Sequence, residues 1–296
     1  MARAYPVLLA LVAACSSRPA PHAINISDDW GRPVALAAPA TRIVSLSPAT
    51  TEILFALGLG PRVVGRTRFC DWPPAARAVP DVGNGIEPSV EAVAARRPDL
   101  VLLYTSAANR AAADRLAALG IATAVLKLDL ASDVRRAART IAQLAGVPAV
   151  AESLVAAFDS SLRAVAARSA SVPGRRLRLY VDAWASPPMT VGRGSYLSEV
   201  IRAAGAENLF DDVGASSATV SLEAIVARDP DAVLVLALDT LHEPSLGGRP
   251  GWSAVRAVRE GRVLVVDANL YDRPSPRMGV AAADLAARLS RMTWKR

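Results

Sequence analysis

The chain has 296 residues, enough for two compact lobes, and its composition of 52% hydrophobic and 21% charged residues is typical of a globular α/β protein. The formal net charge of +7 comes almost entirely from arginines scattered among alanine and aspartate, without a basic block or interleaved aromatic residues, which argues against nucleic-acid binding. The only histidines, His22 and His242, are far apart in the sequence, so a metal site built from several histidines is not expected.

Residues 1–15 contain a lone arginine, a short apolar run and two small residues before Cys15. This layout is typical of an export signal, and the run is too short for a membrane-spanning helix. Segment 12–15 resembles a bacterial lipobox, in which the cysteine is acylated and becomes the mature N-terminus. The alternative is an ordinary signal peptide in which Cys15 is incidental. Cys70 is then left unpaired, so no internal disulfide is expected.

Residues 16–40 are interpreted as a flexible tether followed by a β-hairpin, because two alternating runs flank a turn at 29–31. A first lobe is predicted over 41–146. It begins with a buried strand and a helix at 47–58. The free N–H groups at the start of this helix are either a site for a polar ligand group or simply capped by Ser47.

A repeated phrase lies at the centre of each half of the chain. Segments 89–99 and 221–231 are identical at seven of eleven positions. In each copy a serine begins a helix, and a glutamate (Glu91 or Glu223) follows in the first turn, where the helix dipole favours negative charge. A proline then ends the helix before an aliphatic run that is predicted to be a buried strand of a parallel sheet. The repeat therefore predicts two similar lobes.

Between the two copies, residues 148–167 are predicted to form one long helix of about 30 Å, within a bridging segment over 147–170. Its apolar stripe is expected to contain Val150, Leu154, Phe158, Leu162 and Val165. Because this helix separates the copies, we expect it to bridge the first lobe and a second lobe over 171–296. The predicted fold class is α/β, with two Rossmann-like lobes that contain parallel sheets and are joined by one long α-helix.

Loops rich in bulky and polar residues follow several predicted strands. Ligands of open α/β sheets bind at the carboxyl ends of strands, so the loops at 68–74, 81–86 and 104–109 are expected to meet at one cleft edge. An aromatic residue at a strand end is often part of the core, but Trp72 beside two prolines is harder to explain in that way. Loop 183–189 is expected on the ligand side of the second lobe.

Signatures of familiar enzyme classes are missing from the sequence. The Gly58-Leu-Gly60 segment follows a helix, so it is not a dinucleotide fingerprint, and there is neither a P-loop nor a Gly-x-Ser-x-Gly elbow. Only His242 is available for a catalytic triad, and no pair of loops clusters histidine, cysteine and carboxylates for a catalytic metal. An enzyme is therefore the weaker interpretation, and no catalytic residue, cofactor or metal site is expected.

Several motifs together resemble a known family. They are the lipobox, the Asp-Trp-Gly-Arg hairpin, the duplicated Ser-x-Glu-Ala phrase, and segments 42–52, 69–73 and 273–277. Over residues 23–291 the chain resembles the substrate-binding proteins of metal-chelate ABC importers, and within them the vitamin B12-binding branch. The resemblance implies capture of a corrinoid and its delivery to a permease dimer with ATPase subunits. Haem or ferric-siderophore binding is the alternative within the family, and a cell-envelope cleft enzyme is the remote one.

The resemblance also implies ligand-binding residues. The B12-binding branch lines its cleft with aromatic side chains at the positions of Trp72, Tyr104, Trp184 and Tyr271. The same branch has an arginine at the position that corresponds to Arg273. Flat apolar walls suit a large macrocycle, and an arginine can pair with amide or carboxylate groups at its edge. Where the family pattern has two further aromatic residues, this chain has Asn84 and, at about the second position, Ser217. The second-lobe disulfide of the family pattern is also missing. A more polar pocket is therefore expected, with Asn84 as a ligand contact.

In the resembled family, the positions of Glu91 and Glu223 carry exposed glutamates that pair with arginines on the two permease subunits. Compensation of the helix dipole is the alternative, but it does not require the same residue in both lobes. The resulting expectation is a monomeric receptor that binds a metal chelate and no nucleic acid. A lipid on Cys15 would hold it in the periplasm or at the outer face of the cytoplasmic membrane.

Overall fold

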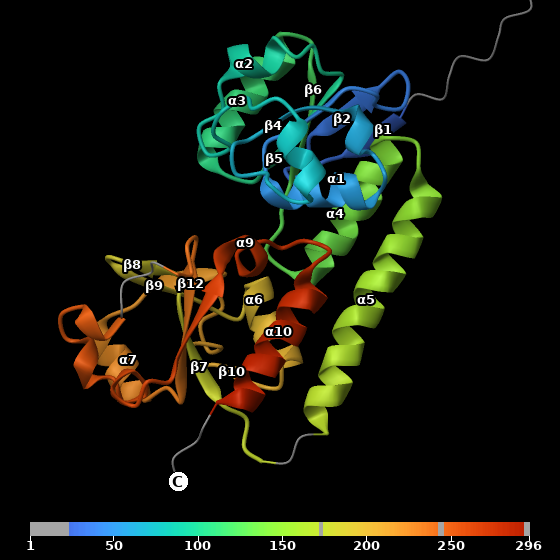
Figure 1. Ribbon diagram of the computed structural model, residues 1–296. Helices are drawn as coiled ribbons and strands as arrows, with labels where there is room; N and C mark the ends of the chain where they lie inside the picture. Colours follow the sequence, from blue (N-terminus) through green and yellow to red (C-terminus); the bar gives the residue numbers. More distant parts are fainter. Residues whose placement is uncertain (1–23, 172–173, 242–245, 293–296) are drawn as a thin grey trace, which may run out of the picture.

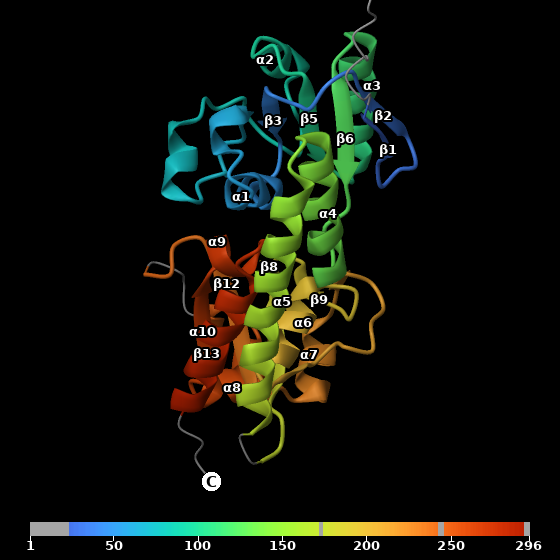
Figure 2. The same cartoon turned by 90° about the vertical axis from the view of Figure 1, so that its right-hand side faces the viewer.

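The computed structural model describes residues 24–171, 174–241 and 246–292. The predicted signal segment with Cys15, and both histidines, lie outside these described residues. The described chain forms two α/β lobes, one above the other, beside the long helix α5 (Pro148–Ala170), as Figures 1 and 2 show. The predicted fold class is confirmed.

The N-lobe is built on a parallel four-stranded sheet in the order β4-β3-β5-β6. Its strands are β3 (Ile43–Ser45), β4 (Val63–Arg66), β5 (Leu100–Tyr104) and β6 (Ala122–Leu126). Its helices are α1 (Pro48–Ala56), α2 (Val90–Ala94), α3 (Ala107–Ala118) and α4 (Ala131–Leu144), with short 3-10 turns at Gly60–Arg62 and Pro74–Ala78. Alternate strand residues point to opposite faces, so Leu102 packs with α1 and α4, whereas Val101 packs with α2 and α3.

The predicted hairpin is confirmed as β1 (Ile24–Ser27) and β2 (Pro33–Leu36), which pair antiparallel. Its turn is attached to the outer edge of β6. The Asp29 N–H donates to the Val125 carbonyl at 3.0 Å, and the Lys127 N–H donates to the Asp29 carboxylate at 2.6 Å. The hairpin therefore covers an edge strand that would otherwise present unpaired backbone groups.

The C-lobe repeats this plan with a parallel sheet in the order β10-β7-β12-β13. The strands are β7 (Arg178–Asp182), β10 (Glu207–Asn208), β12 (Ala232–Ala237) and β13 (Val263–Asp267). A small antiparallel sheet contains β8 (Trp184–Ala185), β9 (Pro188–Val191) and β11 (Ser217–Thr219). The helices are α6 (Tyr196–Ala203), α7 (Leu222–Arg228), α8 (Arg256–Arg259), α9 (Ala268–Tyr271) and α10 (Met278–Arg291), with 3-10 turns at Leu246–Gly248 and Trp252–Ala254. When the strands of each main sheet are numbered in chain order, both sheets have the spatial order 2-1-3-4.

The repeated phrase occupies the same place in both lobes, where a short helix leads into the third strand of the sheet. Ser89 accepts the Ala92 N–H at 3.1 Å, and Ser221 accepts the Ala224 N–H at 3.2 Å, so both serines cap their helices as predicted. The ninth residue of each copy has a left-handed backbone, with φ of 49° at Arg97 and 45° at Asp229. This reversal turns the chain from the helix toward the strand.

The aspartate that ends each copy ties the third strand to the first. The Asp99 carboxylate accepts the Arg42 N–H at 3.0 Å, and the Asp231 carboxylate accepts the Arg178 N–H at 2.8 Å. Both aspartates therefore fix the start of the neighbouring strand. Much of the identity between the copies has this structural explanation, but the paired glutamates do not follow from it.

Helix α5 connects the lobes through one shared core. It packs against α4 of the N-lobe and against α6 and α10 of the C-lobe. The predicted stripe is wrong at Val150, which is 41% exposed; Val155 is buried in its place. At the crossing with α10, a Cβ on Gly279 would approach the Ser161 Cβ to 2.7 Å, so glycine permits this close packing. None of the described helices is long and apolar enough to span a membrane.

Candidate functional site

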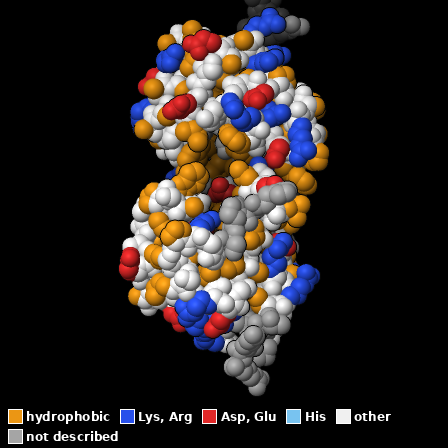
Figure 3. Space-filling model, turned by 60° about the vertical axis from the view of Figure 1, so that its left-hand side comes forward, with side chains coloured by type: hydrophobic (Ala, Val, Ile, Leu, Met, Phe, Trp, Pro, Cys, Tyr) orange, Lys and Arg blue, Asp and Glu red, His pale blue; other side chains and the backbone are white. Residues whose placement is uncertain are grey.

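A cavity of about 290 Å³ lies between the two lobes. The N-lobe contributes the first residues of α1, Tyr104 at the end of β5, and Asp129 after β6; the C-lobe contributes Tyr196, Ser217 and Arg273 among others. Several of these residues follow the carboxyl ends of parallel strands, where open α/β sheets bind ligands. In Figure 3 a hollow separates the lobes, with hydrophobic side chains around it.

A second hollow, of about 480 Å³, lies between β2, β6 and α3. N-lobe residues alone line it, and an ion pair of 3.0 Å between Arg32 and Asp114 lies along its wall. The inter-lobe cavity is the stronger candidate site despite its smaller volume, because strand ends from both lobes converge there and Tyr104 and Tyr196 line it.

Tyr104 lies in the cavity wall, where the sequence placed it. Its hydroxyl donates to Asp129 Oδ1 at 2.9 Å. Burial, followed by the effect of the Asp129 carboxylate, raises the pKa of Tyr104 to about 12. Tyr104 is therefore a neutral phenol at physiological pH.

Arg273 also lines the cavity, but its guanidinium is engaged by the protein. The side chain is 6% exposed; it pairs with Asp71 at 2.6 Å and lies 3.4 Å from Glu52. Its second nitrogen donates to the Phe69 carbonyl at 3.1 Å and to the Asn269 side chain at 2.5 Å. The expected pairing of Arg273 with ligand groups would compete with these contacts.

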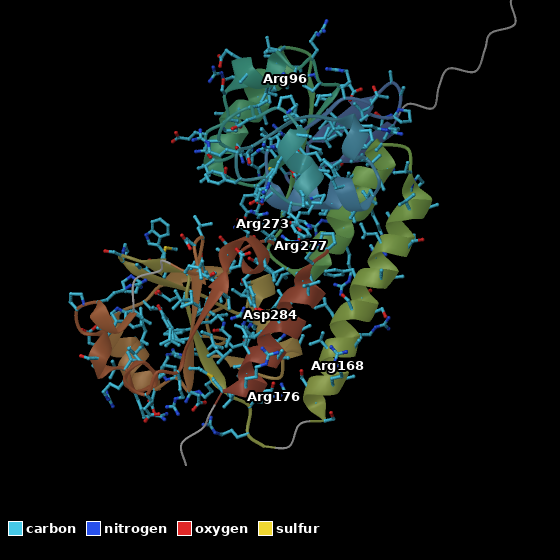
Figure 4. All side chains as sticks on the ribbon, in the orientation of Figure 1. Arg96, Arg168, Arg176, Arg273, Arg277 and Asp284 are labelled. Atoms are coloured by element: carbon cyan, nitrogen blue, oxygen red, sulfur yellow. The ribbon has the colours of Figure 1, made fainter. Side chains whose placement is uncertain are left out.

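Glu52 of α1 is the centre of an ion-pair network that joins the lobes. Arg277 holds this buried carboxylate through two hydrogen bonds, of 2.7 and 2.6 Å, while Arg273 approaches from the same side. Figure 4 shows both arginines at the edge of the C-lobe that faces the N-lobe. Three charges of alternating sign therefore connect residues more than 200 positions apart in the sequence.

Trp72 and Trp184 belong to opposite lobes and are both exposed. Trp72, 43% exposed, lies in the loop after β4, and the Arg277 guanidinium stacks 4.5 Å from its ring centre. Trp184, 63% exposed, is on β8, where its indole N–H donates to the Ser186 carbonyl at 3.2 Å. Both rings have free apolar surface that the fold does not use.

Two predicted ligand contacts have other roles in this structure. Tyr271 is 1% exposed, and its hydroxyl donates to Asp284 at 2.9 Å, so in this structure the ring packs in the C-lobe core and is not among the residues that line the cavity. Asn84 accepts the Ile86 N–H at 2.9 Å and stabilises its own turn. It is not among the residues that line the cavity, whereas Ser217, its companion in the sequence pattern, is.

Sequence reasoning missed four polar residues of this region: Glu52, Asp129, Tyr196 and Asp272. The Tyr196 hydroxyl donates to the Tyr271 carbonyl at 2.9 Å, and its N–H donates to the Asp129 carbonyl at 2.5 Å, which is a second link between the lobes. The strand-end rule would have indicated Asp129, which follows β6. A lone acidic residue in the apolar helix α1 was the available signal for Glu52.

Glu91 and Glu223 are exposed in the first turns of α2 and α7. Hydrogen bonding to each residue's own backbone N–H, and then to the capping serine, lowers the pKa of both carboxyls. Glu91 also lies 3.3 Å from Arg115, another exposed side chain. The two helices are far apart, one in each lobe, on the side of the molecule away from α5 (Figure 1).

The described residues offer one free thiol and no clustered set of metal ligands. Within the described ranges, no group of three or more histidine, cysteine, aspartate or glutamate side chains is arranged to hold a metal ion. Cys70 is buried and free, with its Sγ 3.1 Å from the Thr67 hydroxyl, and burial raises the pKa of its thiol. A buried neutral thiol of this kind is unreactive.

The two lobes, the single long helix and the cavity between the lobes define a two-lobed ligand-binding protein. The model of the periplasmic binding protein family matches residues 43–270, and the chain belongs to this family. The match confirms the resemblance to the substrate-binding proteins of ABC importers, which are transport proteins.

Three similar proteins cover most of the chain. The uncharacterized ABC transporter substrate-binding lipoprotein YvrC of Bacillus subtilis is 30% identical over 278 residues, 92% of this chain and 87% of that protein. The vitamin B12-binding protein of Salmonella typhimurium is 30% identical over 262 residues, 86% of this chain and 91% of that protein. The periplasmic heme-binding protein BhuT in complex with two hemes has 28% identity and a TM-score of 0.75, and the match covers 84% of this chain and 97% of that one.

Proposed function

We propose that this protein captures a corrinoid of the vitamin B12 type outside the cytoplasmic membrane and delivers it to the permease of an ABC importer. The observation that carries the proposal is the inter-lobe cavity lined by Tyr104 and Tyr196, together with two exposed tryptophans, Trp72 on the N-lobe and Trp184 on the C-lobe. Stacking surfaces of this kind suit a large, partly apolar macrocycle. The similarity to a vitamin B12-binding protein supports the same ligand class.

The chemistry of the cavity favours a corrinoid over haem. Haem iron in proteins is usually held by histidine, cysteine, methionine or tyrosinate. Among the described residues that line the cavity there is no histidine, cysteine or methionine, and the hydroxyls of its two tyrosines are already engaged, Tyr104 with Asp129 and Tyr196 with the Tyr271 carbonyl. Cobalamin carries its own axial ligands and needs none of these groups.

Haem is the second candidate, because BhuT, whose solved structure contains two hemes, has a similar fold and 28% identity. To separate the candidates, the purified protein is incubated with cyanocobalamin, haemin or ferric siderophores, and free ligand is removed before the visible spectrum is recorded. Retained corrinoid bands are the expected result. A retained Soret band without corrinoid bands would assign the cargo to haem, and turnover of a cell-envelope substrate would favour the enzyme alternative.

Replacing Trp72 or Trp184 by alanine is expected to weaken cyanocobalamin binding by roughly tenfold or more, because each indole offers a large flat apolar surface. Since both side chains are substantially exposed, the melting temperature should change little. Titration by isothermal calorimetry and thermal melts measure the two effects. Leu119→Ala is the control, an exposed apolar side chain that directly follows α3 and does not line the cavity. A Trp72→Ala protein that unfolds without a separate loss of affinity would make Trp72 a core residue.

We also propose that the mature protein is anchored by a lipid on Cys15, and the description of YvrC as a lipoprotein supports this. Cys15→Ser is expected to move the protein from the membrane fraction to the soluble fraction of expressing cells, because acylation needs the thiol. Fractionation and immunoblotting measure the distribution, with Cys70→Ser as the control. Unchanged membrane retention of the Cys15→Ser variant would exclude the lipid anchor.

A further inference from the structure

Three charged side chains line the inter-lobe cavity: Asp129, Asp272 and Arg273. Arg273 is the only cation among these lining residues, and its two terminal nitrogens already contact Asp71, Glu52, Asn269 and the Phe69 carbonyl. Its charge is therefore balanced by carboxylates on the N-lobe side. The two aspartates are left as the charged groups of the cavity that can accept new hydrogen bonds.

Asp129 and Asp272 approach the cavity from opposite lobes. Asp129 receives one bond, from the Tyr104 hydroxyl to Oδ1, while its Oδ2 lies 3.5 Å from Lys127, which is beyond good hydrogen-bond geometry. Asp272 is exposed in the cavity wall, next to Arg273 and Tyr196, and forms no ion pair with any described residue. Part of the Asp272 surface opens into the cavity, yet desolvation by the surrounding protein raises its pKa, and the charge of Arg273 and a hydrogen bond with Tyr196 oppose this only in part.

We propose that Asp129 and Asp272 make the cavity select ligands that present N–H donors at their edge and reject ligands that present carboxylates there. This inference rests on the proposed function. A corrin ring is surrounded by primary amides, which can donate to these oxygens, whereas haem carries two propionates. The aspartates therefore act as specificity-determining residues, distinct from the aromatic walls that accept either macrocycle.

The physical basis is the sign of the charge at the cavity wall. Hydrogen bonds from an amide to a carboxylate are charge-assisted and stronger than bonds between neutral groups. A ligand carboxylate placed near the same aspartates meets like charges in a partly desolvated cavity, where repulsion is poorly screened. One amide-to-acid change at the contacting edge is expected to weaken binding at least about tenfold.

The test compares ligands that differ only in this group. Cyanocobalamin is paired with each of its isomeric monocarboxylic acids, in which one peripheral amide has been hydrolysed. Haemin is paired with its dimethyl ester. Dissociation constants are measured by calorimetry at mildly alkaline pH for the wild type, Asp129→Asn and Asp272→Asn. Asp114→Asn, a surface aspartate of α3, is the control for a simple loss of one negative charge.

We expect the wild type and Asp114→Asn to prefer cyanocobalamin over at least one monoacid by about tenfold or more, and the two cavity variants to lose most of that preference. Equal binding of amide and acid by the wild type, or an unchanged ratio in both cavity variants, would overturn the inference while leaving corrinoid binding intact. If cyanocobalamin does not bind, the proposed function fails, and the comparison of haemin with its dimethyl ester then tests the inference. If the wild type binds haemin dimethyl ester more tightly than haemin, and the cavity variants lose this preference, the inference is supported. Equal binding of the two compounds, or binding of neither, overturns it.

Discussion

Glu52→Gln is expected to lower the free energy of unfolding by about 3–5 kcal/mol, the typical effect of removing one member of a buried ion pair. The Glu52 carboxylate is buried and accepts two hydrogen bonds from Arg277, with Arg273 beside it. An amide would leave two guanidinium groups with one fewer counter-charge in a site that water does not reach. Urea unfolding followed by circular dichroism measures the loss.

Asp71→Asn is the matched control for this prediction. It removes a carboxylate from the same network, but the Asp71 side chain is 31% exposed and contacts Arg273 alone among the arginines, so solvent can replace part of the interaction. Its effect should be clearly smaller. Adding Arg277→Leu to Glu52→Gln should recover part of the lost stability, because a largely desolvated guanidinium that has lost its counter-charge is then removed. If Glu52→Gln and Asp71→Asn lower the free energy of unfolding equally, the buried Glu52 carboxylate contributes no more to stability than the partly exposed Asp71.

The double variant Glu91→Ala/Glu223→Ala is expected to reduce ligand uptake through the cognate permease by more than about tenfold, with intermediate losses for the single variants. We propose that these glutamates dock the receptor, one per lobe, onto basic residues of the two permease subunits. Both are exposed, and they occupy equivalent positions in lobes with the same strand order. Uptake of labelled cyanocobalamin by proteoliposomes containing the permease and its ATPase subunits measures the effect.

Ligand affinity and stability should be preserved in these docking variants, because neither glutamate lines the cavity and both are exposed to solvent. Glu87→Ala and Glu207→Ala are the controls, since each removes an exposed glutamate of one lobe outside the repeated phrase. Normal uptake by the double variant would leave Glu91 and Glu223 with only a role at the helix N-termini. The same conclusion would follow if the two control variants lost as much transport.

Local sequence patterns predicted the architecture because each lobe depends on short-range rules. The serine caps, the stop at proline and the aliphatic run after it are all contained in 89–99 and 221–231 and the residues next to them, and the structure uses them as predicted. The strand at Ala122–Leu126 follows from its β-branched and apolar residues between turns. The boundaries of the long helix were also close, since it needs only a proline start and apolar periodicity.

The site was predicted less well, because side-chain partners come from distant parts of the chain. Tyr271 has the residue type of a cleft wall, but α9 directs its ring into the core, where Asp284 of α10 accepts its hydroxyl. Glu52 and Arg277 are separated by more than 200 residues, so no local pattern relates them. Family resemblance indicated the aromatic positions. Asp129 and Asp272 could be recognised only from the three-dimensional structure, which shows that they line the cavity.

The core that α5 shares with both lobes has a consequence for cooperativity. One hydrophobic cluster extends from the N-lobe sheet through Val155 and Phe158 to the C-lobe sheet. Neither lobe can lose its packing against α5 without exposing apolar surface of this shared cluster, so we expect the molecule to melt as a single calorimetric unit, although it is divided into two lobes. We therefore expect a destabilising change in one lobe to lower the melting temperature of the whole protein, rather than to produce a separate transition for that lobe.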